Sequence, residues 1–228
     1  MPIADFIASH AFCVKAPIKP LGPEAGQTPF GYNYHAIRNG LPNALRTFAA
    51  GGTARVAFLG GSITQMKGWR ESVAEDLQKR FPKTQFDFVH AGIGSLGSTP
   101  GAFRLERDVL SRGRVDLLIA ESAVNDSTNG HTDIEQIRAV EGIVRHTLTS
   151  NPEADVLLLY FVDPSKMDDI RKGERPAVIR NHERVAAHYF LRDTRRHARY
   201  VGASDYGGED TDGMGKIDEN FVRPESIM

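Results

Sequence analysis

Apolar and polar residues alternate along the chain in two rhythms, which outline the secondary structure from residue 55 onward. Short, mostly apolar runs rich in Val, Leu, Ile and Phe are typical of strands. Longer segments with apolar residues at four-residue steps are typical of helices that bury one face. The strands are expected at Val56–Leu59, Phe86–His90, Val115–Ala120 and Asp155–Val162, with a short fifth strand at Tyr200–Gly202.

Helices are expected between these strands. Thr99-Pro100 opens one of them, because a capping residue precedes a proline at the first helical position. Thr132 and Glu135 form a capping box that opens another. The apolar face of that helix is expected to consist of Ile134, Ile137, Val140, Val144 and Leu148. The helices are expected at Gly68–Phe81, Thr99–Arg112, Thr132 through Leu148 and Arg175–Phe190.

Strands that alternate with helices at this spacing predict an α/β fold, a doubly wound parallel sheet of about five strands with helices on both faces. The nearly continuous apolar run Asp155–Val162 is typical of a strand buried on both faces. We expect three regions: an N-terminal covering arm over residues 1–54 with a short helix near Asn43–Ala50, the α/β core over residues 55–203, and an acidic, glycine-rich tail over residues 204–228.

Composition narrows the class of protein without identifying it. The 228 residues carry 28 Lys and Arg against 29 Asp and Glu, so no excess charge favours binding to nucleic acid or to an anionic membrane surface. The single cysteine, Cys13, excludes an internal disulfide and a cysteine-based metal cluster. We expect no metal and no cofactor. Without a basic-then-apolar leader, a cytoplasmic protein is the default expectation, or a secreted or periplasmic one if a signal peptide was removed.

Three loops that follow the expected strands are polar or rich in glycine, namely Gly60–Thr64, Gly92–Ser98 and Val124–Asn129. The carboxyl ends of parallel strands meet at one edge of the sheet, where ligands bind in such folds. Ser62 stands on a strand–turn–helix junction, the geometry that presents a nucleophile. Acyl transfer also requires donors for the oxyanion, and the backbone amides of the second loop and the side chain of Asn125 can supply them.

Each of these residues also has a purely structural interpretation. Ser62 could cap a helix or form part of an anion-binding turn, because Gly-Gly-Ser before a helix also suits phosphate. Asn125 could bond its own backbone in an Asx turn. Gly94 and Gly97 could serve only a tight connection. A phosphate or nucleotide binder is disfavoured, since no lysine and no G-x-G-x-x-G follow the turn.

The residues resemble the SGNH hydrolases, also called GDSL-like lipases and acylhydrolases. Gly60–Thr64 is similar to the first block of that family, with Gly-Gly-Ser in place of Gly-Asp-Ser, and Ala91–Ser95 is similar to the second block. Val124–Asp126 is similar to the third block. The resemblance implies a flavodoxin-like three-layer fold, a catalytic Ser62 and an oxyanion hole from Asn125 with Gly94, Ser95 or Gly97, where the family's second-block glycine falls on Ser95.

The general base is where the sequence departs from the family, whose late Asp-x-x-His block supplies a histidine. No histidine follows His197. Asn220 and Arg223 occupy the corresponding places, and a guanidinium stays protonated near neutral pH. Only four residues follow Pro224, so we expect loss of this block by truncation or a change of reading frame. His131, six residues after Asn125, is the best-placed substitute base.

Two other histidines near the expected site have structural interpretations. His182 lies within the apolar stripe of the last helix and is expected to be a packing residue with its hydrogen bonds satisfied. His90 ends the second strand and is expected to form a hydrogen bond with the neighbouring turn.

The sequence thus predicts a serine ester hydrolase of the SGNH type that acts on a small or carbohydrate-linked acyl ester, with acetyl favoured. The alternative is a catalytically inactive relative that binds a sugar or acyl ligand, and the missing late histidine supports it. The partner in either case is a small-molecule or carbohydrate ester, with no nucleic acid and no membrane.

Overall fold

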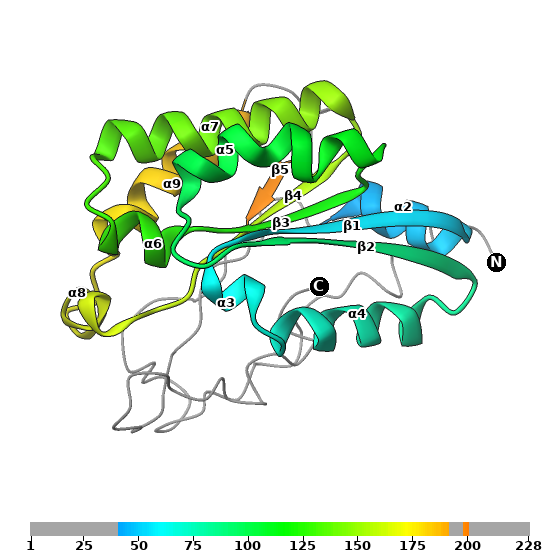
Figure 1. The fold of residues 1–228 in the computed structure, drawn as a ribbon, viewed down its shortest axis with the longest axis horizontal. Helices are drawn as coiled ribbons and strands as arrows, with labels where there is room; N and C mark the ends of the chain where they lie inside the picture. Colours follow the sequence, from blue (N-terminus) through cyan, green and yellow to red (C-terminus); the bar gives the residue numbers. More distant parts are fainter. Residues whose placement is uncertain (1–40, 192–197, 201–228) are drawn as a thin grey trace.

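The computed structural model describes residues 41–191 and 198–200, which form a parallel sheet between two layers of helices (Figure 1). The strands are β1 (Gly52–Gly60), β2 (Thr84–Gly92), β3 (Leu117–Glu121), β4 (Asp155–Leu159) and the short β5 (Ala198–Tyr200). Their order in the sheet is β2-β1-β3-β4-β5. This is the flavodoxin order, in which the winding direction reverses between β1 and β3. The predicted three-layer fold is therefore confirmed.

Helices cover both faces of this sheet (Figure 1). On one face lie α5 (Ser98–Asp108), α7 (Asp133–Ser150) and α9 (Ala177–Leu191), and on the other lie α2 (Pro42–Ala50) and α4 (Trp69–Arg80). Short helical segments connect them: α3 (Ser62–Gln65), η1 (Leu110–Arg112), α6 (Ala123–Thr128), η2 (Pro164–Lys166) and α8 (Met167–Arg171). The two faces bury separate hydrophobic clusters.

The alternation of side chains along β1 supplies both clusters. Ala57 and Leu59 point toward the α5–α7–α9 layer, whereas Val56 and Phe58 point toward the α2–α4 layer. The Phe58 ring packs edge-on against Trp69 with centroids 5.3 Å apart, and it also contacts Phe88. The helix predicted over Gly68–Phe81 is confirmed as α4, and its residues Trp69, Val73 and Leu77, at four-residue steps, are all buried.

One position on the predicted helix faces differs from expectation. Ile134, at the start of α7, is 52% exposed. The buried face of that turn contains Gln136 instead, whose amide donates to the His131 carbonyl at 2.8 Å and accepts from Asn181 at 2.9 Å. This polar network turns the first part of the helix away from the expected apolar stripe. The capping box of Thr132 and Glu135 is confirmed.

The segment before β1 is held to the sheet by α2. Ala44 and Phe48 are buried on it, and the Ala44 N–H donates to Asp155 Oδ2 at 2.9 Å. Most of the predicted N-terminal arm and the acidic tail lie outside the described residues, so the three-region division stays a prediction. Among the helices described, none is both long enough and apolar enough to cross a membrane.

We expect Phe58→Ala to lower the free energy of unfolding by about 3–5 kcal/mol, because it removes a fully buried ring and leaves a cavity. Phe103 of α5 provides a matched control, since its side chain is 85% exposed. Phe103→Ala should change the free energy of unfolding by less than about 0.5 kcal/mol. Urea denaturation of the three proteins measures both values, and equal losses for the two variants would contradict the assigned packing.

Candidate active site

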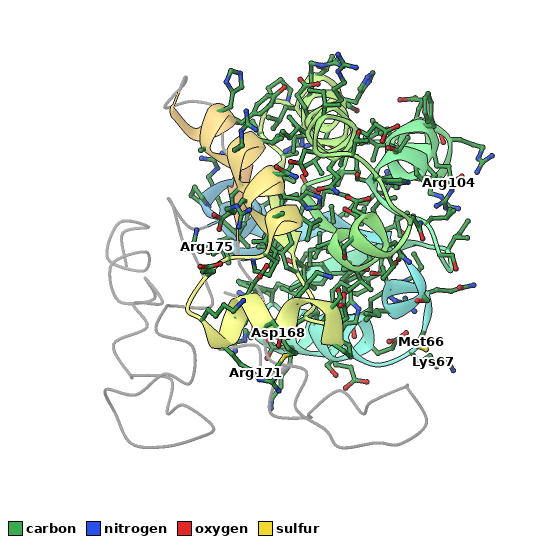
Figure 2. All side chains as sticks on the ribbon, turned by 90° about the vertical axis from the view of Figure 1, so that its left-hand side faces the viewer. Met66, Lys67, Arg104, Asp168, Arg171 and Arg175 are labelled. Atoms are coloured by element: carbon green, nitrogen blue, oxygen red, sulfur yellow. The ribbon has the colours of Figure 1, made fainter. Side chains whose placement is uncertain are left out.

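The three polar loops meet at the carboxyl edge of the sheet, as predicted. Gly60 at the end of β1 pairs with Gly92 at the end of β2, and the Ile93 N–H donates to the Gly60 carbonyl at 3.0 Å. Figure 2 looks onto this edge. Met66 and Lys67, which follow α3, lie on one side of the view, and Asp168 and Arg171 of α8 lie on the other.

Ser62 is the first residue of α3 and is exposed at this edge. Within the described part of the chain, its hydroxyl forms no hydrogen bond with another residue. Its Cβ lies 4.0 Å from the position that a Cβ on Gly94 would occupy, so the hydroxyl stands beside the second loop. The side chain is thus accessible and close to backbone amides, as a nucleophile needs to be.

Asn125 packs directly against the turn that carries Ser62. A Cβ at Gly61 would overlap Asn125 Oδ1, so a larger residue at that position would require the Asn125 amide to move. The Asn125 Nδ2 group has no hydrogen-bond partner among residues 41–191, which leaves it available as a donor.

The segment around Asn125 was expected to be a loop, and this was wrong. Residues Ala123–Thr128 form the helix α6. Six residues are too few to display a helical period, and Asn, Asp, Ser and Thr are weak helix formers, so the pattern did not reveal it. Tertiary contacts hold α6 in place: Lys166 Nζ donates to Ser127 Oγ at 2.6 Å, and Asp126 is bonded to His182 of α9.

The three candidate oxyanion residues of the second loop differ in hydrogen bonding, backbone conformation and burial. The Gly94 N–H donates to Gln65 Oε1 at 2.8 Å and is therefore already occupied. Ser95 has a φ of 60°, the left-handed region that glycine favours, which agrees with the family glycine falling on this position. Gly97 is buried against Asp126 and His131, where a Cβ would lie 3.2 Å from His131 Cε1.

Asp126 is fully buried and joins three elements. Its carboxylate accepts from His182 Nε2 at 2.8 Å, from the Ser98 N–H at 2.6 Å and from His131 Nδ1 at 3.2 Å. Burial alone would raise the pKa of Asp126, but the hydrogen bonds from His182 and Ser98 and the His182 charge lower it below its usual value. With Nδ1 bonded to the carboxylate, Nε2 of His131 has no hydrogen-bond partner among the residues that the structure describes.

His182 has the predicted packing role, whereas the partner of His90 is Arg70 of α4 rather than the neighbouring turn that was expected. His182 is buried, bonded to Asp126 and packed against Tyr160 with ring centroids 5.4 Å apart. His90 stacks on Phe58 and contacts the Arg70 guanidinium, whose other nitrogen donates to the Gln65 and Met66 carbonyls. Burial and the Arg70 charge lower the pKa of His90, so the neutral ring accepts from Arg70.

A family model described as the GDSL-like lipase/acylhydrolase family matches residues 58–213, which contain all three loops. The chain belongs to this family. No match was found among curated protein sequences.

Solved structures of this family share the fold. A two-domain esterase active on acetylated mannans, crystallised with mannopentaose, is 31% identical with a TM-score of 0.58, and the match covers 73% of this chain and 43% of that one. The chain thus spans less than half of that esterase. TesA is 21% identical with a TM-score of 0.50 over 59% of this chain and 73% of its own. An α/β hydrolase from the metagenome of Lake Arreo, Spain, is 19% identical with a TM-score of 0.50, covering 62% and 76% respectively.

Glu121 is a further component of this candidate site, and it was not predicted from the sequence. It is 1% exposed at the end of β3, and its Oε2 accepts from the Gly61 N–H at 3.3 Å and from Thr64 Oγ1 at 3.1 Å. Burial raises its pKa to about 7, although the bonds from Gly61 and Thr64 act in the opposite direction. The sequence signal for Glu121 was a single acidic residue that ends an apolar run, Leu117–Ala120. Glu121 therefore holds the turn before Ser62 through these two hydrogen bonds.

We expect the contribution of Glu121 to stability to fall as the pH rises from 4.5 to about 7, because over this window native Glu121 keeps a proton that the unfolded chain releases. The contribution of this group is at most about 1.4 kcal/mol per pH unit. Glu121→Gln, which imitates the protonated form, should lose that part of the slope in urea denaturation. Glu106→Gln, at an exposed position of α5, should keep it, and parallel curves for Glu121→Gln and the unaltered protein would contradict the assignment.

Proposed function

We propose that this chain is a serine ester hydrolase of the SGNH type, with Ser62 as its nucleophile. The observation that carries the proposal is the exposed Ser62 hydroxyl at the end of β1, with Asn125 packed on the preceding glycine and the amides of the second loop beside it. A hydroxyl between two kinds of amide donor is the arrangement that ester hydrolysis requires. Membership in the GDSL-like lipase/acylhydrolase family supports the same chemistry.

The reaction follows the usual two steps of acyl transfer. Ser62 Oγ attacks the ester carbonyl while its proton passes to the base, and the tetrahedral oxyanion accepts hydrogen bonds from the Ser95 N–H and from Asn125 Nδ2. Collapse breaks the bond to the alcohol, which leaves with the proton. Water, deprotonated by the same base, then releases the acid and restores Ser62. Ser95 is assigned rather than Gly94, because the Gly94 N–H is bonded to Gln65.

We assign the general base to His131. Its Nδ1 lies 3.2 Å from the buried Asp126 carboxylate, which would hold the ring with Nε2 free and stabilise the imidazolium that forms. Its position beside Gly97 supports this assignment, since Gly97 belongs to the same loop as Ser95. His182 shares the same carboxylate but is buried, so it is assigned no part in proton transfer.

The proposed substrate is a small or carbohydrate-linked acetyl ester. Support comes from the esterase active on acetylated mannans, which is 31% identical over 73% of this chain. The alternative function, a catalytically inactive protein that binds a sugar or acyl ligand, is favoured by one observation: Asn220 and Arg223 stand where a late Asp-x-x-His block would have its Asp and His.

The nucleophile is tested with p-nitrophenyl acetate and a fluorophosphonate probe. We expect turnover and labelling in the unaltered chain, and a loss of at least 10³-fold in turnover and complete loss of labelling in Ser62→Ala. Ser111→Ala, which removes an exposed hydroxyl in η1, serves as the control and should still label. Labelling that persists in Ser62→Ala would refute the nucleophile assignment, and absent turnover with intact binding of acetylated mannan would favour the alternative.

The base is tested with His131→Gln and with the pH profile of kcat. We expect His131→Gln to lower kcat by roughly 10²–10⁴-fold with little change in KM, because general-base assistance is lost while the oxyanion donors remain. His146→Gln, at an exposed position of α7, should leave kcat unchanged. If His131→Gln retains full kcat, another group supplies the base and the Asp126–His131 pair is only structural.

A further inference from the structure

Two side chains hold the loop between β2 and α5, at the peptide groups on either side of the one that joins Gly94 to Ser95. The Gly94 N–H donates to Gln65 Oε1 at 2.8 Å, and the Ser95 carbonyl accepts from Asn129 Nδ2 at 2.9 Å. Gln65 ends α3, and Asn129 directly follows α6. The two hydrogen bonds therefore connect the loop to two different elements, α3 and the C-terminal end of α6.

The peptide group between these two bonds is the one that carries the Ser95 N–H. Ser95 is also the one non-glycine residue in the described chain with a positive φ, at 60°. A residue with a Cβ adopts this conformation only where its surroundings impose it, and such strain concentrates at functional sites. Within residues 41–191 the Ser95 N–H donates no hydrogen bond. The two side chains thus fix the peptides on either side of an unoccupied donor.

The two loop-holding side chains lie three or four residues after the two proposed site residues, Ser62 and Asn125. Gln65 lies three residues after Ser62 in α3, and Asn129 lies four residues after Asn125, with the Asn129 N–H bonded to the Asn125 carbonyl at 2.8 Å. Residues three or four apart share one helix face. Two residues on one face of α3, Ser62 and Gln65, therefore face the loop. Asn125 in α6 and Asn129 at its end face the same loop.

The Gln65 side of this arrangement is itself anchored. Arg70 is buried and donates to the Gln65 carbonyl at 3.1 Å and to the Met66 carbonyl at 3.0 Å. The α6 side is anchored by Lys166, which is 2% exposed and bonded to Ser127. Both loop-holding side chains therefore extend from backbone that is fixed by buried cations.

We propose that Gln65 and Asn129 are positioning residues that clamp the loop in the strained conformation in which the Ser95 N–H faces the carbonyl attacked by Ser62. This inference rests on the proposed function for the role of the donor. The clamp acts through Ser95 and touches no reacting atom. Oxyanion stabilisation depends on donors placed before the reaction begins, so a loosened donor lowers kcat more than it weakens substrate binding.

The test uses Gln65→Met, which keeps the length of the side chain and removes the acceptor, and Asn129→Leu, which keeps the shape and removes the donor. We expect each to lower kcat for p-nitrophenyl acetate by about 10-fold with KM within about twofold, a fraction of the loss caused by deleting an oxyanion donor. Lys67→Met is the matched control, because it places the same side chain at the same edge without touching the loop.

Ser95→Gly separates a clamp from general structural damage. Glycine adopts a positive φ without strain, so the loop no longer needs to be forced into place. In the Ser95→Gly background, the loss caused by Gln65→Met should therefore shrink to within about threefold, a non-additivity that unspecific destabilisation would not produce. Undiminished losses in that background, or unchanged kcat in both single variants, would overturn the clamp.

A measurement that does not depend on catalysis tests the clamp separately from the proposed function. Amide hydrogen exchange, followed by NMR on the full chain, should show a protected Gly94 N–H in the unaltered protein and at least about 10-fold faster exchange in Gln65→Met. Failure of Ser62 to label with fluorophosphonate would refute the proposed function, and the clamp would then be judged on this exchange alone. An unprotected Gly94 N–H in the unaltered protein would refute the clamp even if the enzyme is active.

Discussion

The close contact between Asn125 and Gly61 is the constraint on which the arrangement of the site depends. These residues follow different strands, β3 and β1, and Asn125 Oδ1 occupies the space that a Cβ at position 61 would take. Glycine at 60 is required more strictly, since a Cβ there would lie 2.7 Å from a backbone atom, the Glu121 carbonyl oxygen. The two glycines therefore let a short helix pack onto the turn that presents Ser62, which brings a hydroxyl and an amide donor to one edge.

Buried polar groups hold this contact in place at a cost in desolvation. Glu121 accepts from the Gly61 N–H and from Thr64, and Asp126 accepts from His131, His182 and Ser98. The two carboxyl groups behave differently: burial raises the pKa of Glu121 to about 7, whereas hydrogen bonds and a charged neighbour lower that of Asp126. Glu121 can therefore stay neutral next to the turn, while Asp126 remains a carboxylate and orients the imidazole rings that it contacts.

The fold was predictable from the sequence because its signals are local and repeated. Strands such as Val56–Leu59 are apolar runs, α4 shows a full four-residue period, and α7 begins at a capping box. The convergence of the three loops followed from the geometry of parallel sheets.

The details of the site depended on contacts that no local pattern encodes. The helix α6 is too short to show a period, and Ile134 lost its place on the buried face to the hydrogen-bonded Gln136. The parts played by Gln65, Asn129 and Glu121 depend on which way a side chain turns in the folded protein. A polar residue beside a glycine-rich loop reads the same in the sequence whether it holds that loop or faces solvent.

The most direct test of the account is a crystal structure of the protein after reaction with a fluorophosphonate, whose adduct imitates the tetrahedral intermediate. We predict a covalent bond to Ser62 Oγ, with one phosphonyl oxygen about 2.7–3.1 Å from both the Ser95 N and Asn125 Nδ2, and Gln65 still bonded to the Gly94 N–H. A phosphonyl oxygen that faces solvent, or that has displaced Gln65 from Gly94, would contradict the account.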